Sequence, residues 1–349
     1  MKHDALPKDD LGGNALFLVW GPPSHGPRSR AFARGLGIDV QFISSTRRRG
    51  LLAAPYKYSH QAVKTLSLLS RRHPHVVFVQ SPPSFAVVVV WLYCLVMNAR
   101  FAVDAHSDAM QSVYWTRPRW LYRYLARRAL TTIVTNEYFA RKVRGWGGRA
   151  LIVRDIPTDF PTRAYPVEGS FNALVVNSFA TDEPLSEIIA AAKGLEDVVF
   201  YVTGDKSRAP RGLTPSVPNN VRFTDYLDDA SYYGLMAASQ VVICLTTRDH
   251  TMQRGACEAL SMGKPIITSK WPLLESYFSK GTVHVCNRAD EIRNGVREIM
   301  QHHSRYKAEI GQLQTEQRRA WHSARDALVS LLNTSSAVGG DDWTTTGGL

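Results

Sequence analysis

The stretch Thr251-Met-Gln-Arg-Gly-Ala-Cys-Glu258-Ala-Leu-Ser-Met-Gly263-Lys-Pro-Ile-Ile-Thr-Ser269 decides how this chain is expected to fold. It follows an apolar run at 240–245 and ends in a second one at 265–269, and both runs are typical of buried strands. The residues between the runs predict a polar loop and a short helix that ends at Gly263. A strand, a loop, a helix and a strand in this order indicate a parallel α/β sheet.

The same stretch predicts a ligand site. A helix that begins at such a loop directs unpaired backbone N–H groups and the positive end of its dipole out of the sheet edge, where a phosphate can bind. Glu258 lies in this helix and is expected to face the same crevice. A carboxylate there can accept hydrogen bonds from the hydroxyls of a ribose, as acidic residues do in other nucleotide sites.

These residues also carry a resemblance to a known family. Glu258-Ala-Leu, then Gly263-Lys-Pro-Ile-Ile-Thr-Ser and Leu274-Glu275, resembles the nucleotide-sugar site of GT-B glycosyltransferases, especially the retaining group called family four. The resemblance covers roughly residues 14–330 and implies an α/β fold of two Rossmann-like domains that face each other across a cleft. That group usually has two glutamates eight positions apart, of which the second binds the ribose and matches Glu258. The first, which contacts the donor sugar, falls on His250 in this chain.

Composition limits the class of protein. The 349 residues are sufficient for two domains with full cores, and 44% hydrophobic residues indicate a globular chain. The net charge of +12 suits nucleic acid, an anionic membrane surface or phosphorylated substrates. The four cysteines are widely spaced in mostly apolar runs, so we expect reduced core residues of a cytosolic protein. They are Cys94, Cys244, Cys257 and Cys286.

Neither a signal peptide nor a membrane-spanning helix is predicted. Residues 1–10 are rich in charge and lack an apolar segment. The longest strongly apolar run, 85–97, is shorter than the roughly 20 residues that a spanning helix needs. A helix that faces a membrane without crossing it remains open for this run.

The first loop of the chain is a candidate phosphate site. An apolar strand at 15–20 leads into a Gly/Pro loop and a helix that extends to residue 35, which is how a Rossmann-like domain begins. The loop lacks the GxGxxG pattern, so a dinucleotide is not implied. In GT-B enzymes the equivalent loop faces the cleft, which makes Gly26, Arg28 and Arg30 candidates for contacting a phosphate of donor or acceptor. The alternative is that both arginines form a solvated helix start.

Polar residues at the end of a later strand are candidates for catalysis. The segments Val79-Gln-Ser-Pro-Pro83 and Val103-Asp-Ala-His106, together with Gly26-Pro-Arg-Ser-Arg30, are similar to the acceptor domain of eukaryotic mannosyltransferases that extend chitobiosyl-diphosphodolichol. Asp104, His106 and Asp108 follow a predicted strand and should lie at the ligand-binding edge of the sheet. His106, with Asp104, could take a proton from an acceptor hydroxyl or position the donor sugar, and a structural histidine is the alternative.

Two basic and aromatic segments suggest a membrane partner. Residues 47–58 precede a predicted helix at 59–70, and residues 113–128 interleave aromatic side chains with arginines. Both suit a helix at an anionic lipid surface, although a solvated basic face or stacking on nucleic-acid bases gives a similar composition. Within the GT-B reading we predict a lipid surface and no nucleic acid. The mannosyltransferases named above act on polyprenyl-linked sugars at a cytosolic membrane face.

The chain is predicted to divide at a proline-rich linker. Strand and helix alternation precedes residue 155 and restarts after residue 170. We therefore predict an acceptor-binding domain at 1–155, a linker at 156–170 and a nucleotide-sugar-binding domain at 171–303. Helices at 304–332 should cross back to the first domain, and residues 333–349 should form a disordered tail.

The resemblance implies a set of donor-binding residues in the second domain. They are Glu258, Arg254, Gly255, Gly204, Lys206, Tyr226 and His250. Many family members place an arginine and a lysine where this chain has Ala180 and Pro184, so Arg254, Lys206 and the arginines of the first loop are the cations left for the diphosphate. No cofactor and no metal are expected, because the chain lacks a DxD motif at a strand end and GT-B enzymes stabilise the leaving diphosphate with helix dipoles and cations.

The sequence therefore predicts a glycosyltransferase that moves a sugar from a nucleoside-diphosphate sugar to a lipid-linked or membrane-bound acceptor. We expect it at the inner face of the membrane, in bacterial-type glycan or glycolipid synthesis. Glu258 favours a retaining hexosyltransferase, whereas the likeness of the first domain to an inverting mannosyltransferase favours the opposite. Two alternatives remain. His250 and the missing diphosphate cations favour a non-catalytic partner subunit, and an epimerase or hydrolase of the same fold is also possible.

Overall fold

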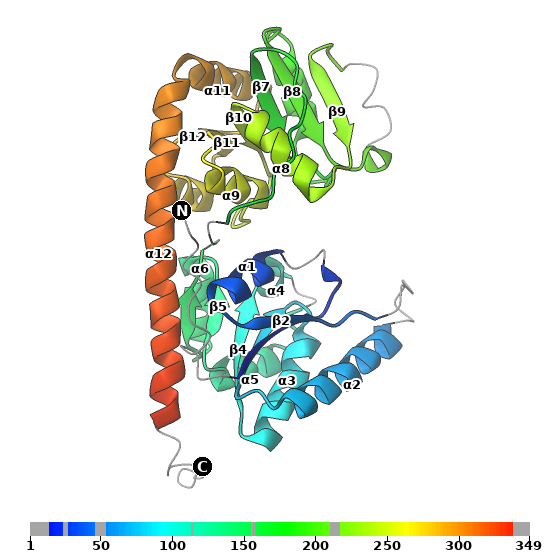
Figure 1. The fold of residues 1–349 in the computed structure, drawn as a ribbon, viewed down its shortest axis with the longest axis vertical. Helices are drawn as coiled ribbons and strands as arrows, with labels where there is room; N and C mark the ends of the chain where they lie inside the picture. The colour runs from blue at the N-terminus through cyan, green and yellow to red at the C-terminus, as the bar shows by residue number, and fades with distance from the viewer. Residues whose placement is uncertain are drawn as a thin grey trace. The chain divides into compact units, whose positions relative to one another are not determined.

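The computed structural model describes residues 14–23, 27–45, 54–112, 115–154, 156, 158–209 and 217–337, with no side-chain description for Pro27 and 333–337. The chain forms two compact units, each with its own sheet (Figure 1). Unit 1 contains Met1–Ile156 and Ala320–Leu349, and unit 2 contains Pro157–Arg319. The two parallel sheets with flanking helices confirm the predicted α/β class.

Unit 1 is built on a six-stranded parallel sheet with the order β2-β1-β3-β4-β5-β6. The strands are β1 (Ala15–Val19), β2 (Asp39–Phe42), β3 (Val76–Ser81), β4 (Arg100–Ala105), β5 (Thr132–Val134) and β6 (Ala150–Ile152). The helices are α1 (Pro27–Gly35), α2 (Ala54–Arg72), α3 (Ser84–Met97), α4 (Ser107–Gln111), α5 (Arg119–Arg128) and α6 (Glu137–Gly145). All carboxyl ends of the strands meet at one sheet edge because every neighbouring pair is parallel.

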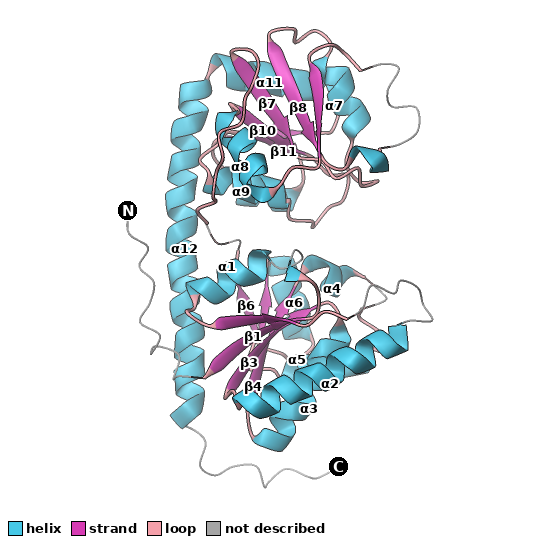
Figure 2. Cartoon of the chain, turned by 45° about the vertical axis from the view of Figure 1, so that its right-hand side comes forward, coloured by secondary structure: helices cyan, strands magenta, loops and turns pink. Residues whose placement is uncertain are grey.

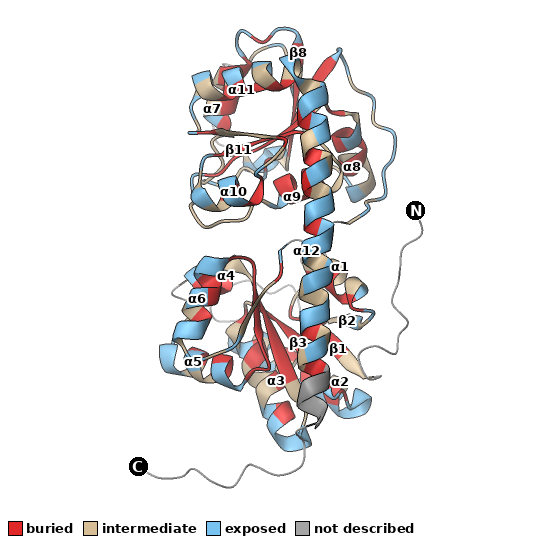
Figure 3. Cartoon of the chain, turned by 90° about the vertical axis from the view of Figure 1, so that its left-hand side faces the viewer, coloured by how far each residue is buried: buried red, intermediate tan, exposed pale blue. Residues whose placement is uncertain are grey.

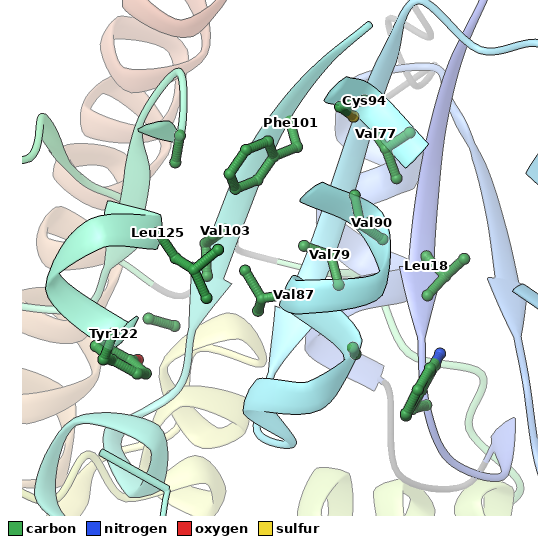
Figure 4. Packing of buried hydrophobic residues seen from close by; sticks show 14 of the residues in the cluster. Leu18, Val77, Val79, Val87, Val90, Cys94, Phe101, Val103, Tyr122 and Leu125 are labelled. Carbon is green, nitrogen blue, oxygen red and sulfur yellow. The ribbon is translucent and has the colours of Figure 1, made fainter. Parts of the chain in front are cut away.

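Alternating side chains of the central strands form a separate core on each face of this sheet. On one face, Val77 and Val79 of β3 pack with Val87 and Val90 of α3 (Figure 4). Cys94 of α3 lies in the same cluster. Side chains of β3 are buried on both faces, which explains why the strand reads as a continuous apolar run.

The other face of this sheet is completed by α12 (His303–Ala337), which begins in unit 2 and ends in unit 1. Leu328 and Leu332 of this helix belong to the same core as Phe32. Buried and exposed positions alternate along α12 (Figure 3). The ring of Trp321 packs edge-on against Phe32, with centroids 5.7 Å apart. A Cβ atom at Gly35 would lie 2.5 Å from Trp321 Cζ2, so only glycine fits beneath this ring.

Unit 2 has a second six-stranded parallel sheet with the order β12-β11-β10-β7-β8-β9. The strands are β7 (Phe171–Val175), β8 (Val198–Thr203), β9 (Val221–Asp225), β10 (Val241–Cys244), β11 (Ile266–Ser269) and β12 (Thr282–Val285). The helices are α7 (Leu185–Ala192), the 3₁₀ helix η3 (Lys206–Arg208), α8 (Asp229–Ala238), α9 (Arg254–Ser261), α10 (Pro272–Tyr277) and α11 (Ala289–Gln301). The strand, loop, helix and strand predicted around Glu258 are β10, the loop before α9, α9 and β11.

Two helices of unit 1 begin where a single residue caps them. The aromatic and arginine-rich helix expected over 113–128 begins only at Arg119, after the N-cap Pro118, so its expected start was wrong. Helix α6 begins at Glu137, because the Asn136 side chain accepts a hydrogen bond from the Phe139 N–H and caps the helix.

The ends of the chain and the cysteines also differ from expectation. Residues 333–337 continue α12 as helix rather than belonging to a tail, while 338–349 lie outside the described residues. Three cysteines are buried as expected, but Cys286 is exposed at the end of β12. Burial raises the pKa of the Cys94 thiol to about 12.

The proline-rich segment after unit 1 packs on unit 2. The ring of Phe160 stacks on Tyr233 of α8 with centroids 4.1 Å apart. The Arg163 N–H donates to the Ala230 carbonyl at 2.9 Å. A Cβ atom at Gly234 would lie 1.7 Å from the Arg163 carbonyl oxygen, so this glycine allows the segment to lie directly on α8.

Candidate functional site

The candidate donor site of unit 2 is formed where α9 begins beside the ends of β7 and β10. Gly255, in the first turn of α9, explains the close approach, because a Cβ atom there would lie 2.6 Å from Val176 Cγ1. The residue therefore has a packing role that its expected donor contact did not anticipate. The helix start and its N–H groups are held against the strand ends, as an anion site requires.

Glu258 is the most densely bonded side chain at this site. Its buried carboxylate accepts a hydrogen bond from Arg254 Nε at 2.7 Å and from the hydroxyls of Tyr232 at 2.9 Å and Tyr233 at 3.2 Å. Burial, and then the charge of Glu258, raise the pKa of Tyr233 and that of Tyr232, so both hydroxyls keep their protons and donate.

This arrangement limits how Glu258 can act on a ligand. A carboxylate has about four lone-pair positions, and three donors from the chain already use this one. A ribose with two hydroxyls would have to replace at least one of these donors. The orientation of the carboxylate and its free acceptor positions are thus set by Tyr232, Tyr233 and Arg254. Of these three residues, the sequence analysis predicted only the arginine for this site.

The loop after β7 lacks a basic side chain and is held by a carboxylate instead. Glu183 accepts hydrogen bonds from the backbone N–H groups of Ser178 at 2.7 Å and Ala180 at 3.0 Å. The next loop comes close to it at Gly204, whose φ is +112°. A Cβ atom at Gly204 would lie 2.5 Å from the Asn177 carbonyl oxygen, so glycine is required where these loops meet.

The remaining predicted donor residues are less tightly held. The Lys206 ammonium lies over the ring of Phe223, 5.8 Å from its centroid. Tyr226 is exposed, following β9. His250 Nε2 lies 3.4 Å from Asp249 Oδ2, and the backbone of His250 is left-handed with φ +56°.

A further cation was missed by the sequence analysis. Arg248 follows β10 and lies 3.5 Å from Asp182 Oδ1, whose other oxygen accepts from the Thr246 hydroxyl at 2.9 Å. The backbone N–H of Arg248 donates to Thr246 Oγ1 at 3.1 Å. The polar residues Thr246 and Thr247 after β10 could have indicated that Arg248 lies at the ligand-binding edge of the sheet. Its pairing with Asp182 was not predictable, because it joins two loops that are distant in sequence.

The candidate site of unit 1 is built around Asp104 at the end of β4. Asp104 is fully buried, with Oδ2 3.2 Å from His106 Nε2 and Oδ1 3.7 Å from an Arg28 guanidinium nitrogen. Arg28 also donates to the Val153 carbonyl at 3.0 Å. The Ser29 hydroxyl donates to Gln80 Oε1 at 2.7 Å, which joins the start of α1 to the end of β3.

The electrostatics of this cluster keep Asp104 ionised. Burial raises the pKa of this carboxyl, but the charge of Arg28 and the hydrogen bond from His106 outweigh burial and lower it below its usual value. Because the carboxylate can only accept, His106 Nε2 must carry the shared proton. In the neutral ring Nδ1 is then the acceptor, as a base acting on a hydroxyl requires.

Not every residue predicted for this site joins the cluster. Arg30 donates to the Pro23 carbonyl at 2.7 Å and lies over the ring of Phe42. Asp108 is exposed in the first turn of α4. Gly26 lies outside the described residues, as do residues 47–53 of the basic segment. Within the described part of the chain, no three His, Cys, Asp or Glu side chains form a group that could hold a metal.

Two family models match the chain, and both describe glycosyltransferases. Residues 13–158 match the family model described as a glycosyl transferase 4-like domain, and residues 183–333 match the model described as glycosyl transferase-like. Each model therefore matches a different part of the chain, the first in the N-terminal half and the second in the C-terminal half. No curated protein matches the sequence.

Solved structures show the same fold. Sucrose-phosphate synthase from Thermosynechococcus elongatus is similar with a TM-score of 0.66 at 12% identity, covering 93% of this chain and 100% of that one. Anabaena HepE in complex with UDP-glucose gives a TM-score of 0.63 at 13% identity, with coverage of 93% and 100%. A putative UDP-N-acetylglucosamine 2-epimerase from Listeria monocytogenes gives 0.62 at 10% identity, with coverage of 93% and 96%.

Proposed function

Because this chain is a glycosyltransferase of the GT-B fold, with a glycosyl transferase 4-like domain before a glycosyl transferase-like domain, we propose that it uses a nucleoside-diphosphate sugar as its donor. The observation that carries the proposal is the Glu258 carboxylate, held by Tyr232, Tyr233 and Arg254 beside the start of α9. HepE, a solved structure of the same fold, was determined with UDP-glucose.

The donor is proposed to bind unit 2 through two kinds of contact. Glu258 exchanges a tyrosine hydroxyl for a ribose hydroxyl. The N–H groups at the start of α9 and the cations on this edge stabilise the diphosphate as negative charge develops on it during transfer. Lys206, Arg248 and Arg254 are the cations, and they replace those that the loop after β7 lacks. No metal or cofactor is needed in this proposal.

The acceptor is proposed to bind unit 1. In this proposal His106, oriented by Asp104, positions the acceptor hydroxyl, and its Nδ1 can take a proton if the reaction inverts configuration. We propose a retaining hexosyl transfer, for which no dedicated base is required. The anomeric configuration of the product, read by NMR, decides between the two outcomes.

We further propose that the acceptor is lipid-linked or membrane-bound, in bacterial-type glycan or glycolipid synthesis at the inner membrane face. The support is the likeness of Gln80-Ser-Pro-Pro and Asp104-Ala-His106 to enzymes that glycosylate polyprenyl-linked sugars. Within the described ranges, no helix is both long and apolar enough to cross a bilayer.

Two other functions have specific support. The likeness to a putative sugar-nucleotide epimerase favours epimerase or hydrolase chemistry on the same donor, without an acceptor. His250 and the absence of basic residues at Ala180 and Pro184 favour a non-catalytic partner subunit. Product analysis with and without acceptor separates the first alternative from transfer.

The test is a thermal-shift panel of UDP, GDP, ADP and their sugars against the wild type and Glu258→Gln. A shift with one nucleotide series that the variant loses supports the donor site. Glu316→Gln is the matched control, because Glu316 is an exposed glutamate of α12 paired with Lys280. The absence of any shift in the wild type would overturn the proposed donor and favour the non-catalytic function.

A further inference from the structure

The exposed apolar side chains of unit 1 gather on three helices. Among the large apolar side chains that the structure describes as exposed, all but Tyr138 and Tyr226 belong to α2, α3 and α5. They are Tyr56, Val63 and Leu66 of α2, Phe85, Leu92, Leu95, Val96 and Met97 of α3, and Trp120 of α5. We call the exposed faces of these helices the α2–α3–α5 surface.

The three helices pack side by side on one face of the sheet, with α3 between the other two (Figures 1 and 2). The ring of Tyr58 on α2 lies 5.1 Å from that of Phe85 on α3. On the other side, Trp91 of α3 packs edge-on against Tyr124 of α5 at 5.5 Å. The apolar side chains therefore form one continuous surface.

The centre and the borders of this surface differ in charge. α3 has the sequence Ser84-Phe-Ala-Val-Val-Val-Val-Trp-Leu-Tyr-Cys-Leu-Val-Met97 and contains no charged residue. All charged residues of the flanking helices α2 and α5 are lysines or arginines, and none of the three helices has an aspartate or glutamate. The exposed cations are Lys57, Lys64, Arg71 and Arg72 of α2, and Arg119, Arg123, Arg127 and Arg128 of α5.

We propose that the α2–α3–α5 surface binds an anionic lipid bilayer, with α3 lying in the plane of the interface. Val96 is 80% exposed and Trp120 is 70% exposed, although water is an unfavourable solvent for both side chains. In a bilayer interface the apolar stripe of α3 is immersed, and the cations on both sides contact lipid phosphates.

Length and charge favour this occupant over others. With 14 residues, α3 is about 21 Å long at about 1.5 Å per residue, which is shorter than the roughly 30 Å hydrocarbon core, so it lies along the interface rather than across it. A second copy of the chain would bring two cationic borders together. A nucleic acid would meet the exposed apolar side chains of α3, which carry neither a charge nor an N–H or O–H group.

The inference deepens the proposed membrane-bound acceptor and rests on it for its purpose, but it is tested without glycosyl transfer. The experiment is co-sedimentation of the full chain with vesicles of phosphatidylcholine, alone or mixed with phosphatidylglycerol, at low and high salt. The wild type should bind the anionic vesicles, and salt should weaken the binding.

Two double variants probe the two parts of the surface. Leu95→Ser with Val96→Ser should lower the partition constant about tenfold or more, because two exposed side chains no longer insert. Lys64→Glu with Arg123→Glu should lower it by at least about fivefold per position. Lys307→Glu with Arg319→Glu on α12 changes the net charge equally, lies outside the surface and should retain binding.

Three outcomes would overturn the proposal. They are no binding of the wild type to anionic vesicles at low salt, an equal loss in the α12 control, and a wild-type dimer that Leu95→Ser with Val96→Ser converts to monomers without any vesicle binding. The last would make the surface a protein interface. Nucleotide thermal shifts on the same samples report the donor site separately, so failure of vesicle binding is distinguishable from failure of the proposed transferase.

Discussion

The shared carboxylate of Glu258 gives opposite predictions for two conservative substitutions. Tyr232→Phe removes the hydroxyl that donates a hydrogen bond to Glu258 Oε2 at 2.9 Å and leaves the rest of the site in place. Glu258→Gln keeps the size of the side chain but removes its charge and one of its two acceptor oxygens. Both should lower stability, but we expect only Glu258→Gln to weaken donor binding.

The magnitudes follow from the hydrogen bonds. Tyr232→Phe loses one hydrogen bond to a charged acceptor, which costs about 1.5–3 kcal/mol of unfolding free energy. The freed oxygen can accept a ribose hydroxyl without an exchange, so a bond of about the same size becomes a net gain and the nucleotide sugar should bind about tenfold to a hundredfold more tightly.

For Glu258→Gln the charge matters most. The Arg254 side chain is half exposed, so loss of this ion pair alone costs at most about 1 kcal/mol. A ribose hydroxyl that donates to a charged acceptor is worth about 1.5–3 kcal/mol, so donor affinity should fall about tenfold to a hundredfold.

Calorimetric titration with the nucleotide sugar that gives the largest thermal shift measures the affinities, and urea denaturation measures the stabilities. The reasoning fails if Glu258→Gln binds donor as tightly as the wild type, because the carboxylate would then serve only the chain. It also fails if Tyr232→Phe lowers the affinity for the nucleotide sugar as much as Glu258→Gln does, because the tyrosine would then contact the nucleotide sugar itself.

Three further predictions concern single positions. Burial raises the pKa of Asp104, but the Arg28 guanidinium and the other groups around it hold that pKa below its usual value. The ionised Asp104 carboxylate should therefore stabilise the folded protein above about pH 4, and this contribution should disappear as the pH falls through the native pKa. Asp104→Asn should remove this pH dependence in thermal unfolding scans between acidic and neutral pH. Gly35→Ala should cost about 1–3 kcal/mol in urea denaturation, because the new Cβ meets the Trp321 ring, and a cost near zero would contradict this packing. Cys286 should react rapidly with a maleimide in the folded protein while the buried cysteines react only after denaturation, and uniform labelling rates would exclude this burial pattern.

Local patterns were sufficient to predict most strands and both sheets. The runs of β3 and β10 are apolar because both faces of each sheet are covered, so burial is visible directly in the sequence. Pro118 and Asn136 changed the helix boundaries of unit 1, since a cap depends on a single hydrogen bond or ring rather than on periodicity.

The candidate sites were predictable as positions but not as networks. Asp104 and His106 lie at the end of β4, and Glu258 lies in α9, the helix that follows β10; both strands are visible in the sequence as apolar runs. The hydrogen bond from Tyr232 to Glu258 joins residues on different helices, and the pair of Arg248 with Asp182 joins different loops. Such pairs depend on how helices and loops are packed, which a single sequence does not encode in its periodicity.

The end of α12 has a consequence for the order in which the protein forms. Leu328 and Leu332 complete a core of unit 1 with Phe32, and Arg100 donates to the Leu332 carbonyl at 3.0 Å. During translation the ribosome therefore releases all strands of unit 1 long before their last packing partners exist. Unit 2 is encoded without interruption between Pro157 and Arg319 and has its complete core earlier. Unit 1 thus begins before unit 2 in the chain but completes its core after it, and a nascent chain that stops before Leu328 lacks two side chains of that core.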